Sequence, residues 1–282
     1  MQKLTPIAIP ALKDNYIWCI KNDHQCAVID PGEATPVLNF LAKKRWQLTQ
    51  ILITHHHDDH QGGILELLAH FPYAEVYGSV TEAIMGLNRP LLGGETLKIV
   101  GLETQVMALP GHTLGHLGYY LDGALFCGDT LFGGGCGRLF EGSYEQLYES
   151  LQKISELPND TQIFPAHEYT LQNLKFAEAV EPLEVNPKIQ IRIGKVRDLL
   201  DKKKPTLPSL LGEEKLTNPF LRCHKESVKK SVAEFINKNK HKSKSKSKSK
   251  SKENTETNEN QEQILLSDLE TFIALRKWRN NF

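Results

Sequence analysis

Four histidines and two aspartates occupy six consecutive positions of this chain, in the segment Thr54–His60, directly after an apolar strand-like run. Neutral imidazole is the most common metal ligand in proteins, and alternate residues of an extended segment point to the same side. We therefore expect His55 and His57 to bind one metal ion. Asp59 and His60 lie one step further around the turn and are expected to bind a second ion. As a solvated loop this composition would be unfavourable, because its histidines would repel one another near about pH 6.

Three further residues can complete the two metal sites. His112, Asp129 and His167 each follow a strand-like run, as the first motif does. Functional side chains of α/β folds gather beyond such strand ends. We therefore expect two sets of three ligands and one carboxylate that bridges both metal ions: His55, His57 and His112; Asp59, His60 and His167; and Asp129 as the bridge.

Two metal ions that lie ~3.5–4 Å apart can share a water molecule and lower its pKa towards ~7. The resulting hydroxide attacks a carbonyl carbon, so the predicted reaction is metal-assisted hydrolysis, with Asp59 and Asp129 as its catalytic carboxylates. No serine or cysteine nucleophile is required, and Cys136 is expected to be a small packed residue. The nitrogen and oxygen ligands suit two divalent metal ions per chain, with zinc favoured and iron or manganese as alternatives.

Residues close to the motifs have more ordinary expected roles. His116 should hydrogen-bond within its own loop instead of binding metal. Asp30, at the end of a strand-like run, either orients a metal ligand from behind or caps the turn at Pro31-Gly32. The remaining histidines have no ligand-spaced partner and are expected at the surface: His24, His70, His224 and His241.

Residues 1–171 have the pattern of α/β layers. Short apolar runs end in Gly, Pro, Asp or His and alternate with stretches of helical spacing. The expected strands are 25–30, 50–54, 105–109, 123–127 and 161–164, and the expected helices are 33–44, 62–70 and 144–157.

From residue 172 onward we expect the strands to stop. Helical spacing continues over 171–180, 187–202 and 227–237. The last helix should begin at a capping box formed by Ser267 and Glu270. The sequence thus predicts a catalytic domain over 1–171 and a mainly helical domain over 172–282.

A strict Lys-Ser repeat interrupts the second domain. It has no apolar side chain to bury, so we expect a disordered insertion near 238–262. A solvated linker is favoured over a tether to anionic surfaces, since glutamates follow the lysines. The stretch 238–252 holds eight of the 34 basic residues and no acid, so 26 basic and 34 acidic residues remain elsewhere.

Composition excludes several classes of protein. An acidic remainder argues against nucleic-acid binding, in which phosphate contacts dominate. Five cysteines without a C-x-x-C pair do not form a disulfide framework, which favours a reducing compartment. We expect a cytoplasmic protein, because neither a secretory signal nor an apolar run long enough to span a membrane is visible. We also expect a monomer.

Four motifs, taken in order, resemble the metallo-β-lactamase superfamily and most closely its glyoxalase II branch, the hydroxyacylglutathione hydrolases. They are T-H-H-H-x-D-H, G-H-T-x-G-H, G-D-T-L-F and H-E-Y-T. The resemblance implies an αββα sandwich with a C-terminal helical domain over the site. It also implies a thioesterase that hydrolyses S-D-lactoylglutathione to glutathione and D-lactate, the second step of methylglyoxal detoxification. All seven expected metal ligands match the family pattern.

The resemblance further implies four glutathione contacts: Arg138, Tyr169, Arg222 and Lys225. Arginine suits this task because it grips carboxylates with two hydrogen bonds, and glutathione carries two carboxylates. Phe140 stands where some members of the family have a tyrosine, so one hydroxyl contact to glutathione is expected to be missing.

Two other functions compete with this interpretation. One is a different enzyme on the same fold, such as a persulfide dioxygenase-like protein or another hydrolase, although persulfide dioxygenases lack the long helical domain with N-P-F-L-R. The other is a non-catalytic scaffold whose lysine-rich segment binds anionic surfaces. A scaffold has no need of seven metal ligands, so an enzyme is the favoured expectation.

Overall fold

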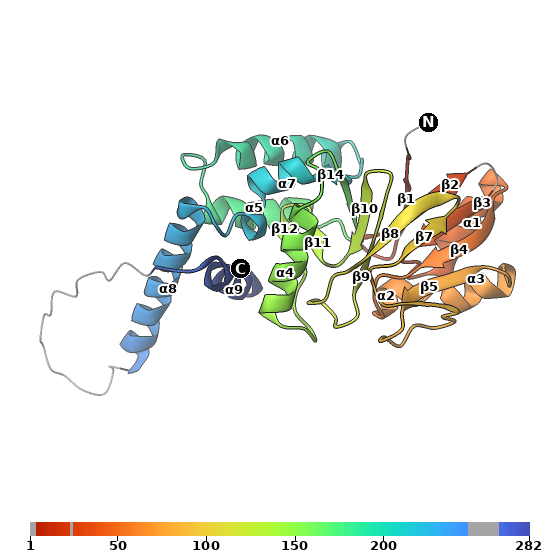
Figure 1. Ribbon diagram of the computed structural model, residues 1–282. Helices are drawn as coiled ribbons and strands as arrows, with labels where there is room; N and C mark the ends of the chain where they lie inside the picture. Colours follow the sequence, from red (N-terminus) through yellow and green to blue (C-terminus); the bar gives the residue numbers. More distant parts are fainter. Residues whose placement is uncertain (1–3, 23–24, 248–264) are drawn as a thin grey trace, which may run out of the picture.

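Alternating side chains bury both faces of the first sheet. In strand β2 (Asn15–Asn22), Ile17 and Cys19 pack on one side while Trp18 and Ile20 pack on the other. Successive side chains of a strand point to opposite faces, so a run of consecutive apolar residues such as 17–20 must be covered on both sides. The computed structural model, which describes residues 4–22, 25–247 and 265–282, provides both covers (Figure 1).

Each of two six-stranded sheets combines antiparallel and parallel pairs. In spatial order, the first contains β1 (Ile7–Ala11), β2, β3 (Gln25–Ile29), β4 (Gln47–Leu52), β5 (Glu75–Ser79) and β6 (Arg89–Leu91). The second contains β14 (Ser209–Leu210), β13 (Gln162–Pro165), β10 (Ala124–Gly128), β9 (Leu117–Leu121), β8 (Leu102–Ala108) and β7 (Thr96–Ile99). A short ribbon of β11 (Leu131–Phe132) and β12 (Gly135–Cys136) follows β10.

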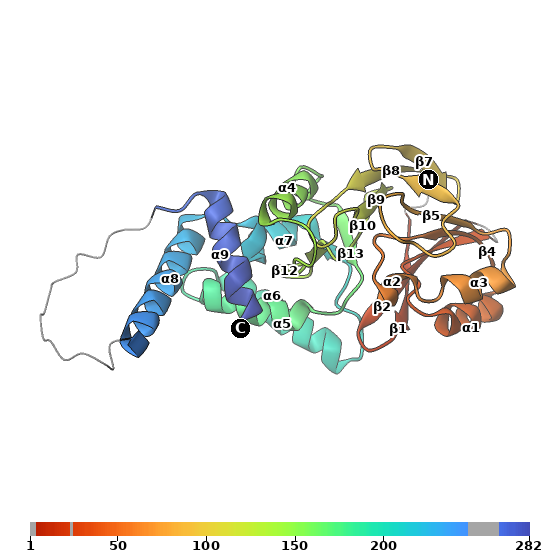
Figure 2. The same ribbon diagram turned by 90° about the horizontal axis from the view of Figure 1, so that it is seen from below.

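Helices cover the outer faces of both sheets, as Figure 2 shows. The first sheet carries α1 (Ala34–Lys44), α2 (Asp58–Gln61) and α3 (Ile64–His70). Beyond the outer face of the second sheet lie α4 (Tyr144–Ser155), α5 (Thr170–Val180), α6 (Pro187–Asp201), α7 (Leu211–Thr217), the 3-10 turn η1 (Pro219–Leu221), α8 (Glu226–Ser247) and α9 (Asp268–Asn280). Of these, α8 packs on α9 and α5 and not on the sheet.

Three of the hydrophobic cores in the described part of the chain lie between these layers. One lies between the first sheet and α1 and α3, with Val28 and Leu41 among its residues. A second lies between the sheets, where Phe126 and Phe164 stack. The third joins the second sheet to the helices and includes Phe272 of α9. This order of layers confirms the αββα sandwich and the C-terminal helical part.

The C-terminal part differs from expectation at two points and agrees with it at a third. The strands do not stop at residue 172, because β14 pairs antiparallel with β13 at the edge of the second sheet. Helix α7, which follows β14, was not expected. The capping box of α9 forms as predicted, with Ser267 accepting a hydrogen bond from the backbone N–H of Glu270.

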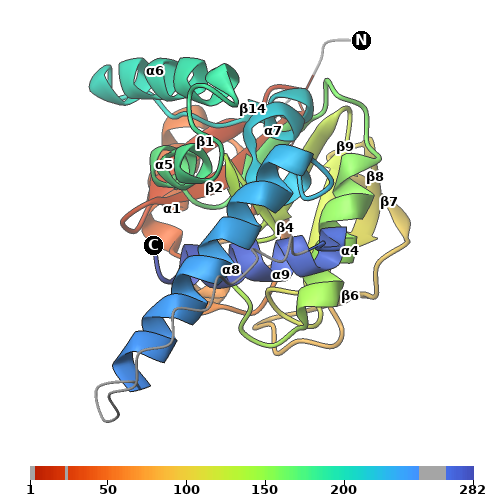
Figure 3. The same cartoon turned by 90° about the vertical axis from the view of Figure 1, so that its left-hand side faces the viewer.

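Helix α8 also corrects the expected insertion. It continues through Ser247, well into the Lys-Ser repeat, and its C-terminal end projects beyond the other helices in Figure 3. Once a helix has begun, each added residue costs little, and lysine is a good helix former. The disorder expected for 238–247 is therefore wrong, and the rest of that segment lies outside the described residues. In the part of the chain that the structure describes, no helix is long and apolar enough to cross a membrane.

Candidate metal centre and adjoining pocket

The histidine motif lies at the end of β4, where the chain turns into the short helix α2. Asp59 and His60 belong to α2, and His57 directly precedes it. The turn is tightly packed: a Cβ atom at Gly32 would lie 1.9 Å from the carbonyl oxygen of Asp59. Only glycine fits there, so the backbone that carries Asp59 is held against the end of β3.

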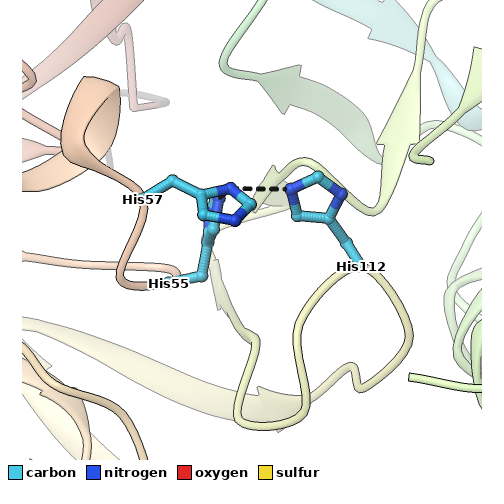
Figure 4. Close-up of side chains that lie close together, drawn as sticks. All are labelled: His55, His57 and His112. Atoms are coloured by element: carbon cyan, nitrogen blue, oxygen red, sulfur yellow. Dashed lines mark hydrogen bonds between the residues drawn. The ribbon is translucent and has the colours of Figure 1, made fainter. Parts of the chain in front are cut away.

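The first expected ligand set comes together as predicted. His55 Nε2 lies 2.9 Å from His57 Nδ1, which lies 3.1 Å from His112 Nε2. Figure 4 shows His112 approaching from its own loop, opposite the segment that carries the other two histidines. These three nitrogens could therefore bind one metal ion.

The second set also comes together. Asp59 Oδ2 lies 3.3 Å from His167 Nε2 and 3.6 Å from His60 Nε2. Asp129 lies between the sets, with Oδ1 3.5 Å from His60 Nε2 and Oδ2 3.5 Å from His112 Nε2. The structure thus brings all seven expected ligands into one cluster and puts Asp129 where a bridging carboxylate is needed.

Two buried atoms of this cluster lack a hydrogen-bond partner: Nε2 of His60 and Oδ1 of Asp129. Leaving buried polar groups unpaired is costly. Both atoms point into the cluster, and both are the kinds of atom that bind divalent metal ions. The residues therefore fit a metal centre.

Hydrogen bonds behind the ligands fix which nitrogen faces the cluster, but the two sets use different partners. In the second set, carboxylates stand behind the imidazoles: Asp30 Oδ2 lies 3.0 Å from His60 Nδ1, and Asp14 Oδ1 lies 2.9 Å from His167 Nδ1. A carboxylate accepts the Nδ1 proton, which leaves the Nε2 lone pair free for a metal ion. Asp30 therefore orients a ligand, one of its two expected roles.

Neutral groups stand behind the first set. His55 Nδ1 lies 3.1 Å from the hydroxyl of Thr54, and His112 Nδ1 lies 2.6 Å from the carbonyl oxygen of Arg138. The second set is consequently the more anionic of the two. Imidazoles backed by carboxylates are also the more basic donors.

Electrostatics within the cluster follow the same division. Burial and the neighbouring histidines hold the pKa of His55 well below its usual range, so this imidazole is neutral and able to bind metal. Burial also acts to lower the pKa of His167, but the carboxylates of Asp129, Asp59 and Asp14 outweigh it and raise the pKa to about 9. The second set therefore favours a positive charge at its centre.

His116 does not join the ligand sets, but its hydrogen bonds reach the loop of Asp129 and Thr130 and not, as expected, its own loop. It is fully buried, its Nε2 accepts a hydrogen bond from the backbone N–H of Asp129 at 3.2 Å, and its ring stacks on His55. Phe140 is largely exposed, with its ring edge-on to His57 and His112.

A pocket of about 230 Å³ adjoins the cluster. Phe132 and Tyr169 form the wall that the two share, since the Tyr169 ring stacks on His167 with 4.8 Å between centroids. The pocket is lined by Phe132, Cys136, Arg138, Tyr169, Asn173, Arg276, Arg279 and Asn280. Two of the four predicted glutathione contacts, Arg138 and Tyr169, are among them.

Arg222 and Lys225 do not reach this pocket. The guanidinium of Arg222 donates two hydrogen bonds to Glu181, at 2.7 and 2.9 Å, so it is already paired with a buried carboxylate. Lys225 is exposed in the turn before α8. Arg222 and Lys225 therefore add no positive charge to the lining of this pocket.

Two arginines of α9 that the sequence analysis did not single out, Arg276 and Arg279, line the pocket. Arg276 donates hydrogen bonds to the carbonyl oxygens of Cys136 and Gly137, and Arg279 donates to Asn173. Burial and the adjacent Arg276 lower the pKa of Arg279, which indicates uncompensated positive charge. The usable signal was their spacing, because residues three apart share one face of a helix.

Family comparisons match both parts of the chain. The metallo-beta-lactamase superfamily model matches residues 13–167, and the hydroxyacylglutathione hydrolase C-terminus model matches residues 168–282. A hydroxyacylglutathione hydrolase of Photobacterium profundum is 46% identical over 99% of this chain and 100% of its own length. Its counterpart in Dechloromonas aromatica is 55% identical over 78% of this chain and 82% of its own length.

Solved structures share the fold. The BLEG-1 B3 metallo-beta-lactamase covers 77% of this chain and 99% of its own, with a TM-score of 0.58 and 22% identity. ETHE1 from Myxococcus xanthus covers 80% of this chain and 99% of its own, with a TM-score of 0.54 and 26% identity. The layered arrangement of sheets and helices is therefore common to several proteins with different names.

Proposed function

This chain belongs to the hydroxyacylglutathione hydrolases of the metallo-β-lactamase superfamily, and we propose that its metal centre and adjoining pocket together hydrolyse S-D-lactoylglutathione to glutathione and D-lactate. The observation that carries this proposal is the contact between the two regions. A cluster of metal-binding side chains shares Phe132 and Tyr169 with a pocket lined by arginines. A thioester of glutathione can use both regions. Metal ions would activate water and polarise the thioester carbonyl, and the arginines would bind the carboxylates of the peptide.

The ligand sets would hold two divalent metal ions, with zinc favoured for the nitrogen and oxygen donors. Such ions lower the pKa of bound water and polarise the carbonyl under attack. Asp129 would contribute to both sets, and Asp59 to the second. The ligand cluster and the pocket can each be built from side chains of a single chain, so we propose a monomer as the functional unit.

The arginines of the pocket would bind the glutathione part of the substrate. Arg138, Arg276 and Arg279 line a pocket to which no acidic side chain of the described residues contributes. Charge-assisted hydrogen bonds from guanidinium groups to carboxylates are among the stronger polar contacts in proteins. Glutathione held there would have its thioester directed past Phe132 and Tyr169 towards the ligand cluster. Arg276 and Arg279 replace Arg222 and Lys225 in this proposal.

We propose a functional division of the chain near residue 171. Residues 1–171 carry all seven metal ligands, and α9 adds two arginines to the pocket from the far end of the chain. The family match over 168–282 also favours a hydrolase over the persulfide dioxygenase-like alternative. The family resemblance implies that a persulfide dioxygenase would lack this helical part.

The decisive experiment is the hydrolysis of S-D-lactoylglutathione by the purified full chain, followed as release of free thiol. We expect release that chelation abolishes and added Zn²⁺ restores. S-Methylglutathione, which has no thioester carbonyl, is the matched control and should release nothing. Protein that carries about two metal ions but releases no thiol would overturn the substrate and retain the metal centre.

A further inference from the structure

Glu82 is a buried acid outside every motif of this chain. It lies between β5 and β6, and its side chain is only 3% exposed. The surrounding chain is well anchored, because Gln61 of α2 hydrogen-bonds to the backbone of Ala83 and Met85 on either side of Ile84. A buried carboxylate needs several hydrogen bonds to offset the loss of water.

Each carboxylate oxygen of Glu82 serves a different loop. Oε2 accepts a hydrogen bond from the backbone N–H of His56 at 2.7 Å and lies 3.1 Å from the same residue's Nδ1. Oε1 accepts hydrogen bonds from the hydroxyl of Thr113 and from the backbone N–H of Gly115 at 2.9 Å. One loop carries His55 and His57, and the other carries His112.

Close packing also fixes the carboxylate in place. A Cβ atom at Gly115 would lie 2.7 Å from Cγ of Glu82 and 2.6 Å from Oγ of Ser79. The absence of a side chain at Gly115 allows the loop to approach Glu82 this closely. Neither loop can then move relative to the other without breaking a hydrogen bond to the same carboxylate.

We propose that Glu82 is a positioning residue for the first ligand set, holding His55 and His57 opposite His112 at the spacing that one metal ion requires. The role rests on the metal-ligand sets of the proposed function. Glu82 has no contact with His60 or His167 of the second set, whose partners are Asp30 and Asp14. Its effect should therefore fall on one metal ion of the two.

Glu82→Gln separates this role from simple space filling. The amide has the same shape, but its nitrogen donates hydrogen bonds and accepts none. Because both oxygens of Glu82 receive backbone N–H groups, either orientation of the amide sets a donor against a donor. Loss of a direct hydrogen-bond partner of a metal ligand typically weakens metal binding about 10–100-fold. Glu82 bonds to His56, Thr113 and Gly115, which are close neighbours of the ligands, so we expect the lower end of that range.

The experiment measures Zn²⁺ bound per chain at a series of buffered free concentrations, with no assay of activity. Wild type should bind two ions. Glu82→Gln should retain one ion with unchanged affinity and bind the other at least about tenfold more weakly. Glu75→Gln is the matched control: this acid of β5 pairs with Arg89 and Tyr77 and does not contact the loops, so both ions should remain.

A double variant identifies which ion is affected. Asp59→Asn disables the second set, so Glu82→Gln combined with Asp59→Asn should bind neither ion tightly. Co²⁺ in place of Zn²⁺ gives an independent spectroscopic signature, and Glu82→Gln should lose the visible absorption of one site only. If Glu82→Gln does not fold, Thr113→Val removes a single hydrogen bond to Oε1 and should weaken the same site to a smaller degree.

Three results would overturn the proposal. In the first, Glu82→Gln binds both ions as wild type does. In the second, it weakens both ions equally, which would make Glu82 a general stabiliser of the fold. In the third, wild type binds fewer than two ions, which refutes the ligand sets themselves and leaves Glu82 nothing to position.

Discussion

The metal centre and the arginine pocket are neighbours of opposite charge. Around the metal centre stand four carboxylates, those of Asp14, Asp30, Asp59 and Asp129. The pocket presents three guanidinium groups, those of Arg138, Arg276 and Arg279. An aromatic wall, formed by Phe132 and Tyr169, lies between the two regions. One region therefore suits cations and the other suits anions, and a substrate with a carbonyl and distant carboxylates can use both.

The two regions also differ in how the chain builds them. Strand ends and short loops supply the metal centre, and buried hydrogen bonds fix each ligand from behind. The pocket combines a loop at Arg138, the start of α5 at Tyr169 and the last helix, α9. Variants in the first region should therefore change metal content and kcat, whereas variants in the second should change KM. The following predictions test this division.

Asp129→Asn should have the largest effect, because this carboxylate faces both ligand sets. We expect metal content and kcat to fall together, with kcat reduced by at least about 100-fold, since losing a ligand costs more than losing a partner behind one. Metal analysis and initial rates measure the two losses. Full activity with two bound ions would refute the bridging position of Asp129.

Asp30→Asn should affect the metal centre with a smaller loss. Asp30 is buried and accepts hydrogen bonds from the backbone N–H and hydroxyl of Thr54 besides holding His60. We expect metal affinity of the second set to fall by about 100-fold, and by about tenfold for Asp14→Asn, whose carboxylate is partly exposed. Competition with a chelator measures both. A rise in KM at full metal occupancy would contradict the division between the regions.

Arg279→Ala should raise KM by at least about tenfold and leave metal content and kcat within about twofold, because a hydrogen bond between charged groups contributes about 1.5–3 kcal/mol. Lys277→Ala, at an exposed position of the same helix, is the control and should change neither constant. Steady-state kinetics with S-D-lactoylglutathione decide the matter. An unchanged KM would mean that the glutathione part of the substrate binds outside this pocket.

How well the sequence predicted each region follows from the same difference in construction. Metal ligands come at the ends of strands in short motifs, so spacing alone brought all seven together. Arg222 shows why the pocket was harder. The N-P-F segment (218–220) does reach the β11–β12 ribbon, since Asn218 hydrogen-bonds to the carbonyl oxygens of Phe132 and Gly135. Arg222 nevertheless points away from it and pairs with Glu181. A sequence gives the proximity of a segment more readily than the direction of one side chain.

Glu82 and α8 mark two other limits. Glu82 belongs to no motif, and only folding brings the loops of His56 and Thr113 to its two oxygens. Helix α8 extends to Ser247 because continuation of a helix depends on the preceding turns and less on the apolar pattern of each added residue. Both features arise from what surrounds a residue in space, which local spacing does not encode.

Arg222→Ala tests the division from outside both regions. Glu181 is 1% exposed, so removal of Arg222 leaves a buried carboxylate without its main partner. Breaking a buried ion pair costs about 3–5 kcal/mol of unfolding free energy. We expect lower stability in urea unfolding and an unchanged KM. A higher KM at unchanged stability would return Arg222 to the substrate site.

The smallest predicted effect is the pH dependence of the difference in unfolding free energy between wild type and Arg222→Ala. Burial acts to raise the pKa of Glu181, but hydrogen bonds from Arg222, Ser227 and Asn186 outweigh it and hold the pKa below its usual value of 4.5. A carboxylate whose pKa is depressed in the folded state adds stability above its ordinary pKa and loses it as the pH falls through the folded value.

Without Arg222, the effect of burial on the pKa of Glu181 prevails, so protonation of Glu181 removes the unpaired buried charge and stabilises the variant. The stability gap between wild type and Arg222→Ala should therefore be full at about pH 7, begin to narrow above about pH 4.5, where Glu181 of the variant takes up its proton, and narrow further below that pH. Metal loss in acid affects both proteins alike, so the gap isolates the pair, and a gap that stays constant down to about pH 3.5 would show that Glu181 is not the partner that Arg222 stabilises.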